Sequence, residues 1–249
     1  MLRRPFAQMG VALIALAAFS SGAMAAEKSG LSDADRAEIK QMVRDYILAN
    51  PEIINEAIDA LDAKTAKGKS DKRNETIAKR RQELFSPSEG TIIGNPKGDV
   101  TVVEFFDYNC GYCKSMFQGI AELLKEDRSM RLVLKEYPIL GPASMTASRA
   151  ALAARKQGKY AELHLALLSH KGQLSDAVVM DVASKAGLDM KKLENDMKDP
   201  AITEVIVKNH NLADELGIDG TPSLIIGDAF VPGAISKDKL VEHISKARK

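Results

Sequence analysis

The stretch TVVEFFDYNCGYCKSM at residues 101–116 decides how the rest of this sequence is interpreted. Its opening TVVEFF is apolar, β-branched and aromatic except at Glu104, which predicts a strand covered on both faces of a sheet. Asp107 and Asn109 then favour a turn or a helix cap. Apolar residues recur at helical spacing from residue 112 to residue 125. The stretch therefore predicts a buried strand, a short turn and a helix that begins at a cysteine pair.

The pair consists of Cys110 and Cys113, and the sequence contains no other cysteine. A secreted domain stapled by disulfides distributes its cysteines over the fold, whereas an isolated Cys-x-x-Cys pair favours chemistry. We expect Cys110 at the helix N-terminus, where unpaired N–H groups and the helix dipole stabilise a thiolate. Cys113 lies one helical turn further on, so the two sulfurs can close a small disulfide ring. In thiol–disulfide exchange Cys110 would attack and Cys113 would be the buried resolving thiol.

The N-terminus has the three parts of a cleaved signal peptide. Two arginines at residues 3–4 form a basic start, residues 11–19 are an apolar core too short to span a bilayer comfortably, and AMA at residues 23–25 is a cleavage site. We therefore interpret residues 1–25 as a signal peptide; the alternative is an uncleaved membrane anchor. Export places the protein in an oxidising compartment, where protein disulfides form and need correction.

Length and charge set broad limits on the function. The 249 residues are enough for one good-sized domain and an appendage, and 35 basic residues nearly balance 34 acidic ones. Composition therefore gives no indication of nucleic-acid binding, and we expect no nucleic-acid partner.

Two short amphipathic helices are expected after the signal, over residues 33–49 and residues 51–63. Such short helices cannot bury their apolar stripes against each other alone. The stripes need either the following domain or copies of themselves as a partner. We interpret residues 26–63 as an N-terminal helical oligomerisation region.

The next segment, residues 64–89, is rich in Lys and Arg and includes Gly68 and Ser70. It has few apolar residues to pack, which predicts a charged, solvated linker with some helix near residues 74–84. A nucleic-acid or membrane role for this charge run is the weaker alternative, because acidic residues are mixed in.

The remaining residues, 90–249, show the alternation of strands and helices expected of an α/β domain. A short strand precedes the cysteine stretch, another strand follows it, and a helical segment covers about residues 143–199. A further helix, a strand that begins at Thr221-Pro222, a return strand and a final helix complete the chain.

These elements resemble a thioredoxin fold with a helical insertion, and the chain resembles the DsbA-like family of exported thiol-disulfide oxidoreductases. The motifs that carry the resemblance are VEFFDYNCGYCKSM at residues 103–116 and GIDGTPSLIIG at residues 217–227. The segment VRDYILANPEIINEAID at residues 43–59 resembles the N-terminal region of the ScsC (suppressor of copper sensitivity) proteins. In that group this region oligomerises the enzyme, so a homo-oligomer is implied, with a trimer favoured.

The resemblance also implies roles for particular residues. A cis peptide bond before Pro222 would lie beside the cysteine pair and leave the backbone of Thr221 open to pair with a substrate strand. Glu104 matches the buried acid of the family and would relay the proton of Cys113; the alternative is that Glu104 is an edge-facing strand residue. Gly111-Tyr112, between the cysteines, would tune the redox poise and contact the substrate. No cofactor or metal is implied beyond a redox-active Cys110–Cys113 disulfide.

Three functions stay open at this stage. The first is a periplasmic disulfide isomerase or reductase that acts on exported, cysteine-containing proteins, favoured because Gly-Tyr stands where strong oxidases of the family have Pro-His. The second is a DsbA-like dithiol oxidase. The third is a copper(I)-handling protein, since thiolates suit this soft ion. The first two imply a membrane redox partner of the DsbD or DsbB type.

Overall fold

The computed structural model describes residues 30–85 and 91–248. The signal peptide expected at residues 1–25 therefore lies outside the described residues. The chain divides into two compact units, Met1–Asp59 and Ala60–Lys249. Among the described residues, none of the helices combines the length and the apolar character that crossing a membrane requires.

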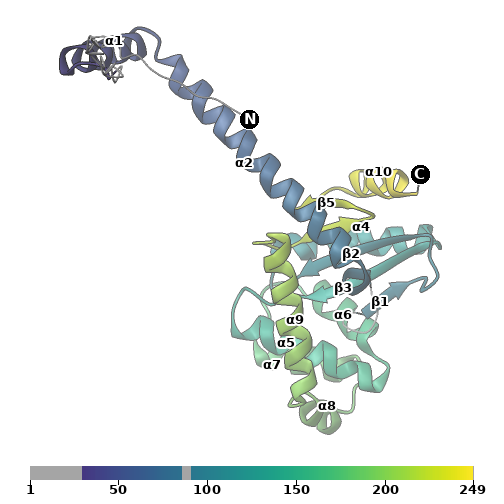
Figure 1. The fold of residues 1–249 in the computed structure, drawn as a ribbon. Coiled ribbons are helices and arrows are strands. Elements are labelled where there is room, and N and C mark those ends of the chain that lie inside the picture. Colours follow the sequence, from purple (N-terminus) through teal and green to yellow (C-terminus); the bar gives the residue numbers. More distant parts are fainter. Residues whose placement is uncertain (1–29, 86–90, 249) are drawn as a thin grey trace, which may run out of the picture. The chain divides into compact units, whose positions relative to one another are not determined.

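The second unit is built on a five-stranded sheet with the strand order β1-β3-β2-β4-β5 (Figure 1). Strands β2 and β3 are parallel and the other pairs are antiparallel. Strand β2 thus lies inside the sheet, between β3 and β4. The strands are β1 (Thr91–Gly94), β2 (Val100–Phe106), β3 (Met130–Glu136), β4 (Ser223–Ile226) and β5 (Ala229–Pro232).

Helices cover both faces of this sheet, as the apolar run in β2 predicts. On one face, Val102 and Phe106 pack in a core with α4 (Gly111–Glu126) and α10 (Lys237–Ala247). On the other face, Val103 and Phe105 pack in a second core with residues of α9 (Pro200–Leu216). The two cores hold the strand that leads to the cysteines from both sides.

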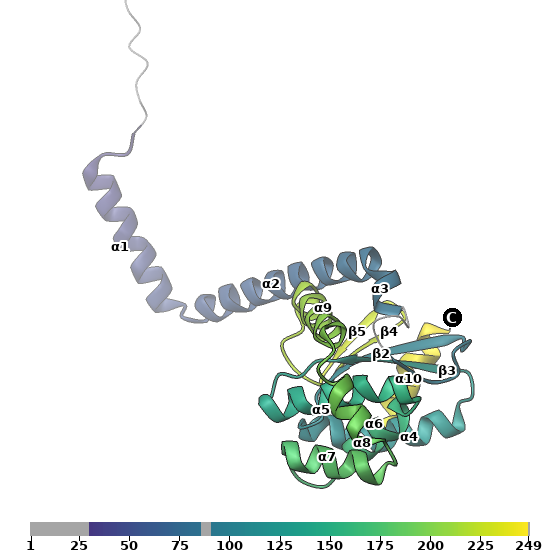
Figure 2. The ribbon, with the colours of Figure 1, turned by 90° about the horizontal axis from the view of Figure 1, so that it is seen from below.

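The helical insertion lies between β3 and α9 (Figure 2). Its first helix contains a run of buried alanines, including Ala147, Ala150 and Ala151, which allows neighbouring helices to approach closely. The insertion comprises α5 (Pro142–Ala154), a 3₁₀ turn (Arg155–Gln157), α6 (Tyr160–Ser169), α7 (Asp176–Lys185) and α8 (Met190–Asp196). The fold class predicted from the sequence, a thioredoxin fold with a helical insertion and an N-terminal helical segment, is confirmed.

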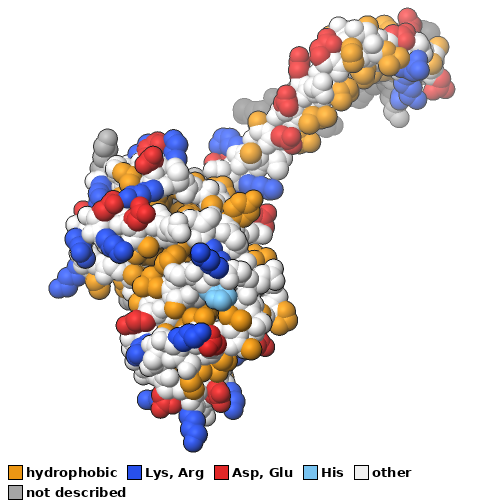
Figure 3. Space-filling model, turned by 180° about the vertical axis from the view of Figure 1, so that it is seen from behind, with side chains coloured by type: hydrophobic (Ala, Val, Ile, Leu, Met, Phe, Trp, Pro, Cys, Tyr) orange, Lys and Arg blue, Asp and Glu red, His pale blue; other side chains and the backbone are white. Residues whose placement is uncertain are grey.

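The first unit contains α1 (Asp33–Ala49) and the beginning of α2 (Glu52–Lys79). Ser32 begins α1 through a capping box with Asp35, in which each side chain bonds the other residue's backbone N–H. No residue of α1 is buried. Figure 3 shows apolar side chains at the surface of this N-terminal segment, and in α1 they include Met42, Val43 and Tyr46.

Helix α2 corrects the expected end of the second helix. The sequence predicts a helix that stops near residue 63 and a solvated linker after it, but α2 continues through Gly68 to Lys79. The i,i+4 ion pairs Lys67–Asp71 and Glu75–Lys79 support the exposed part of this helix. Glycine costs about 1 kcal/mol in a helix interior, too little to end a long helix.

The expected lack of packing in residues 64–89 is also wrong. Ile77 of α2 is 1% exposed and Leu84 of α3 (Arg81–Phe85) is fully buried, both in the core with α9. Buried Lys135 donates from Nζ to the backbone oxygen of Glu83, 2.9 Å away, and so holds α3 on the sheet. The end of the predicted linker is therefore packed into the second unit, because a few apolar residues suffice to anchor it.

Candidate active site

The turn between β2 and α4 places Cys110 at the start of α4. Cys110 is the N-cap of the helix, and its sulfur accepts the backbone N–H of Cys113 at 3.3 Å. The carboxylate of Asp107 holds the turn, because Oδ1 accepts the N–H of Asn109 at 2.7 Å and the hydroxyl of Ser144 at 2.7 Å. The position of Cys110 at a helix N-terminus is therefore set by hydrogen bonds within the turn and by the bond from Ser144 of α5.

Cys110 has the properties of an activated thiol. It is a free cysteine, and its pKa is lowered to about 6. The largest cause is the hydrogen bond from the Cys113 side chain, followed by a bond from the Thr221 side chain and by the backbone N–H groups of Cys113 and Tyr112, while burial opposes them. At neutral pH most Cys110 sulfurs are thus thiolates.

Cys113 has the opposite character. It has no exposed surface, and its pKa is raised far above the usual range of a thiol. The hydrogen bond that its S–H donates to Cys110 is the largest cause, and burial and the charge of Glu104 add to it. The two sulfurs therefore share one proton, which stays on Cys113 while Cys110 carries the charge.

Glu104 lies in the middle of β2 and faces the cysteine side of the sheet. It pairs with Leu134 of β3 and Leu224 of β4, so the alternative that it faces an edge is wrong. The side chain is 2% exposed, and burial raises the pKa of Glu104 to about 8, with a smaller contribution from the charge of Cys110. A carboxyl with this pKa can take up and return a proton near neutral pH.

The loop before β4 brings Thr221 and Pro222 to the same place. The Thr221–Pro222 peptide bond is cis, as the resemblance implies. The carbonyl oxygen of Thr221 lies 3.2 Å from the sulfur of Cys110 and accepts its S–H when Cys110 is protonated. The structure thus brings the threonine–proline pair, which is more than a hundred positions away in the sequence, to the two cysteines and the carboxyl group of Glu104.

The two residues between the cysteines face solvent. Tyr112 is 72% exposed, and a Cβ added at Gly111 would meet nothing within 4 Å. Ile139 and Leu140 add exposed apolar surface nearby, because both of their N–H groups donate to Oδ2 of Asp107, at 2.8 and 3.0 Å. The sequence identified Asp107 only as a turn former, since its bonds to the segment after β3 join residues more than thirty positions apart.

A buried polar cluster lies behind the turn and was missed in the sequence. The hydroxyls of Tyr108 and Tyr160 donate to Oε1 of Glu136 at 3.0 and 2.8 Å, and Tyr108 also bonds Nδ1 of His164 at 3.0 Å. Burial raises the pKa of Glu136 to about 8 and lowers the pKa of His164 to about 3. The cluster ties the turn to helix α6, and no sequence motif marks it because its members come from three separate parts of the chain, the turn after β2, the end of β3 and α6.

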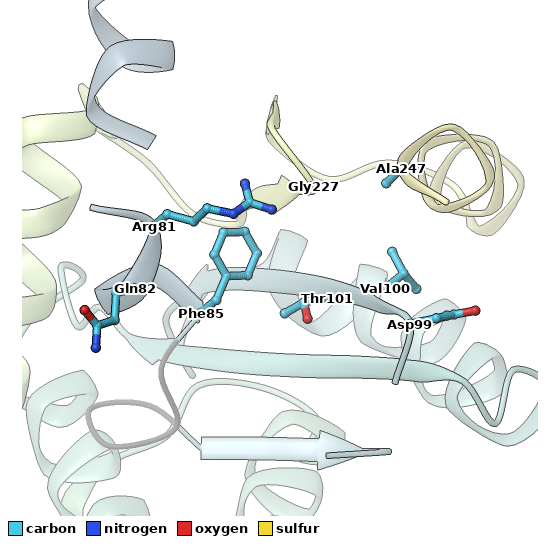
Figure 4. Close-up of a pocket in the computed structure, with 8 residues that line it drawn as sticks. All are labelled: Arg81, Gln82, Phe85, Asp99, Val100, Thr101, Gly227 and Ala247. Carbon is cyan, nitrogen blue, oxygen red and sulfur yellow. The ribbon is translucent and has the colours of Figure 1, made fainter. Parts of the chain in front are cut away.

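A hollow of about 460 Å³ adjoins the cysteine helix and is lined by Gly111, Lys114, Phe117 and His170, among others. A larger hollow of about 760 Å³ lies at the other end of β2, between Arg81, Phe85 and Val100 (Figure 4). The larger one contains neither cysteine. Among the described residues, no group of three or more His, Cys, Asp or Glu side chains is arranged to hold a metal ion.

Comparisons with known proteins agree with this geometry. A family model described as DSBA-like thioredoxin domain matches residues 101–245, and one described as Copper resistance protein ScsC N-terminal domain matches residues 35–67. The crystal structure of a thioredoxin-like oxidoreductase from Silicibacter pomeroyi DSS-3 is 45% identical, with 68% of this chain and 97% of that chain covered and a TM-score of 0.66.

Similarity to the ScsC proteins extends over both units. Proteus mirabilis ScsC in a transitional conformation is 29% identical, with 88% of this chain and 97% of that chain covered and a TM-score of 0.65. A curated relative, the Na(+)/H(+) antiporter NhaA 1 of Salinispora arenicola (strain CNS-205), is 28% identical over 68% of this chain. The match covers only 28% of the length of that antiporter.

The family model over residues 101–245 spans more than half of the chain and includes both cysteines and the Thr221–Pro222 loop. The protein therefore belongs to the family of DSBA-like thioredoxin domains and carries an N-terminal segment of the ScsC type.

Proposed function

We propose that the protein is a periplasmic thiol-disulfide interchange protein that isomerises or reduces the disulfides of exported proteins. The observation that carries the proposal is the opposite pKa shift of the two cysteines, which leaves a thiolate on Cys110 beside a protonated, buried Cys113. Exchange needs one sulfur that attacks at neutral pH and a second that waits in reserve. The expected signal peptide at residues 1–25 and the resemblance to exported enzymes support the periplasmic location.

The first step is attack of the Cys110 thiolate on one sulfur of a client disulfide. A mixed disulfide forms between Cys110 and the client, and the client's other sulfur leaves with the electron pair and takes up a proton. In isomerisation a second client thiolate attacks the client sulfur of the mixed disulfide. A new client disulfide then forms and Cys110 leaves as the thiolate, so no net oxidation occurs.

Reduction uses Cys113 instead. Glu104 in its ionised form, which a pKa of about 8 leaves accessible near neutral pH, accepts the Cys113 proton, and the resulting thiolate attacks the Cys110 sulfur. The client leaves as a dithiol and the enzyme keeps the Cys110–Cys113 disulfide, so two electrons pass from the enzyme to the client. We propose that a membrane partner of the DsbD type returns the two electrons.

Thr221, Pro222, Gly111 and Tyr112 form the proposed substrate surface. Thr221 faces the sulfur of Cys110, and Tyr112 projects into solvent beside it. A client strand that pairs with the backbone of Thr221 would bring its disulfide onto Cys110. The exposed apolar pair Ile139–Leu140 enlarges a surface that suits incompletely folded polypeptides.

The N-terminal helices supply the argument for isomerisation over oxidation. Helix α1 leaves its apolar side chains exposed, and residues 35–67 match the ScsC N-terminal domain. We propose that α1 packs against copies of itself in a homo-oligomer, with a trimer favoured. Several active sites on one assembly would hold a misfolded client while its disulfides are exchanged.

A DsbA-like oxidase, recharged by a DsbB-type membrane partner, is the second candidate, favoured by the DSBA-like domain match. An isomerase or reductase and an oxidase differ in the redox state of Cys110 and Cys113 inside cells. We expect acid-trapped, alkylated samples from the periplasm to contain mainly the dithiol form. A pair found mainly as the disulfide would overturn the isomerase proposal in favour of the oxidase.

Copper(I) handling is the third candidate, because the N-terminal match carries the name of a copper resistance protein. Its ligands would be the two sulfurs of Cys110 and Cys113. Titration of the reduced protein with copper(I) tests it. Equal binding by a Cys110→Ser variant would exclude the pair as ligands.

A further inference from the structure

The loop that presents Thr221 to Cys110 begins where helix α9 ends. Gly217 is the C-cap of α9, with a left-handed φ of 64°, and Thr221 follows four positions later. Tyr137 holds the first part of this loop, because its hydroxyl donates to the carbonyl oxygen of Ile218 at 3.1 Å. The position of Thr221 therefore depends on how firmly the end of α9 is fixed.

Helix α2 lies beside this end of α9 (Figure 2), and Arg73 of α2 and Arg80, directly after α2, supply the groups that fix it. Nε of Arg73 donates to the carbonyl oxygen of Leu216 at 2.7 Å, and Nη2 reaches the carbonyl oxygen of Gly217 at 3.4 Å. The last carbonyls of a helix lack partners within the helix, and a cation at this end is favoured by the helix dipole. Arg80 adds a bond from Nη1 to the carboxylate of Glu215 at 2.7 Å.

Arg73 also contacts the element on the far side of the loop. Its guanidinium carbon lies 3.8 Å from the centroid of the Phe230 ring in β5. Strand β5 pairs with β4, which begins at Ser223, directly after Pro222. A single side chain thus touches the helix before the loop and the hairpin after it, so it fixes the span between them.

We propose that Arg73 is a positioning residue for the reaction: it clamps the end of α9 against the β4–β5 hairpin and thereby keeps Thr221 in place beside Cys110. The inference rests on the proposed function, since it concerns the same thiolate. It places part of the segment that the sequence marks as a linker in the machinery of the active site.

The physical consequence is a change in the acidity of Cys110. The hydrogen bond from the Thr221 side chain is one of the causes that lower the pKa of Cys110. Without the Arg73 side chain, the loop that contains Thr221 is more mobile. The hydrogen bond from Thr221 to Cys110 is then present in a smaller fraction of the molecules. The thiolate loses stabilisation, while Cys113 and the α4 N-terminus are untouched.

The experiment measures the rate at which iodoacetamide alkylates Cys110 in the reduced, full-length protein between pH 4.5 and pH 9.5. For Arg73→Ala we expect the titration to move to higher pH and the rate near pH 6 to fall about threefold. Above pH 9 the rates of variant and parent should agree, because Cys110 is then fully ionised in both. Arg73→Lys, which retains a cation at the helix end, should lie between them.

Lys67→Ala is the matched control. Lys67 lies in α2, as Arg73 does, but its largely exposed side chain pairs with Asp71 of the same helix at 2.7 Å. We expect its titration to match the parent. Circular dichroism shows which variants are folded. If Arg73→Ala does not fold, the same titration is carried out on Arg73→Gln and Arg73→Lys.

Unchanged titration in a folded Arg73 variant would overturn the clamp, and so would an equal shift in Lys67→Ala. A parent protein that titrates like an ordinary thiol would instead overturn the proposed function. The two failures are therefore distinguishable in one set of measurements.

Discussion

Helices α1 and α4 have similar sequence patterns and opposite surroundings. Both are amphipathic, yet α4 buries Met116, Phe117 and Ile120 against the sheet, whereas no residue of α1 is buried. In α4 the apolar stripe faces a sheet of its own unit and holds the cysteines in place. In α1 the same kind of stripe stays exposed, which is the surface expected of a contact with another chain. Amphipathic spacing therefore predicts a helix and which of its faces is apolar, but it does not predict what that face packs against.

The largest expected effect comes from replacing the cysteines that α4 holds in place. Cys110→Ser should reduce disulfide exchange with a scrambled-disulfide ribonuclease by about a thousandfold or more, because the hydroxyl of serine is not ionised at neutral pH. Cys113→Ser should retain attack and accumulate a mixed disulfide, visible by non-reducing electrophoresis. Exchange by the Cys110→Ser variant at the parent's rate would contradict the assignment of the nucleophile.

The next effect concerns the exposed face of α1. Met42→Glu together with Tyr46→Glu places two charges on side chains that are 56% and 62% exposed, so the fold of the single chain should tolerate them. We expect light scattering to show the monomer mass and ribonuclease isomerisation to fall about tenfold, since several sites no longer act on one client.

Alkylation of Cys110 in this double variant should equal that of the parent, because the active site lies in the other unit. Lys40→Gln, elsewhere on α1, is the control and should leave the assembly intact. An assembly that survives both glutamates would show that the α1 face is not the contact.

Glu104→Gln tests the buried acid through the pH dependence of stability. The pKa of Glu104 is raised by burial from 4.5 to about 8 in the folded protein, so folding favours the protonated acid. Its contribution to stability is complete below pH 4.5 and is lost as the pH rises toward 8.

Glutamine cannot ionise, so at pH 7.5 the variant should be more stable than the parent by about 2–4 kcal/mol, and the gain should vanish near pH 4. Urea unfolding of the reduced proteins at both pH values measures this. The reductive release of client from the mixed disulfide should be slower in the variant. A stability gain independent of pH would contradict the raised pKa.

The smallest effect concerns the middle of α2. A Cβ at Gly68 would meet nothing within 4 Å, so Gly68→Ala should stabilise the helix by about 1 kcal/mol without a clash. Circular dichroism and limited proteolysis around residues 64–70 measure the change. Faster cleavage in the alanine variant would argue against a helix at this point.

Local pattern was sufficient where neighbouring residues decide the structure. The strand, turn and helix around Cys110 were predicted because their hydrogen bonds join residues within a few positions, as in the bond from Cys113 N–H to Cys110. The resemblance to the family added the prediction that the Thr221–Pro222 loop lies beside the cysteines. Helix α2 was predicted too short, because nothing within residues 64–81 indicates that Ile77 is buried against α9.

By itself, the sequence determined the cysteine pair, the helix that activates it and the amphipathic character of the N-terminal segment, since each follows from residue type and short-range spacing. Only the tertiary structure decided that Glu104 lies inside the sheet, that Asp107 fixes the segment after β3, and that Arg73 reaches the end of α9. The physical reason is range. Spacing governs contacts along one helix or strand, whereas burial, desolvation and a shifted pKa depend on atoms that folding brings from distant parts of the chain.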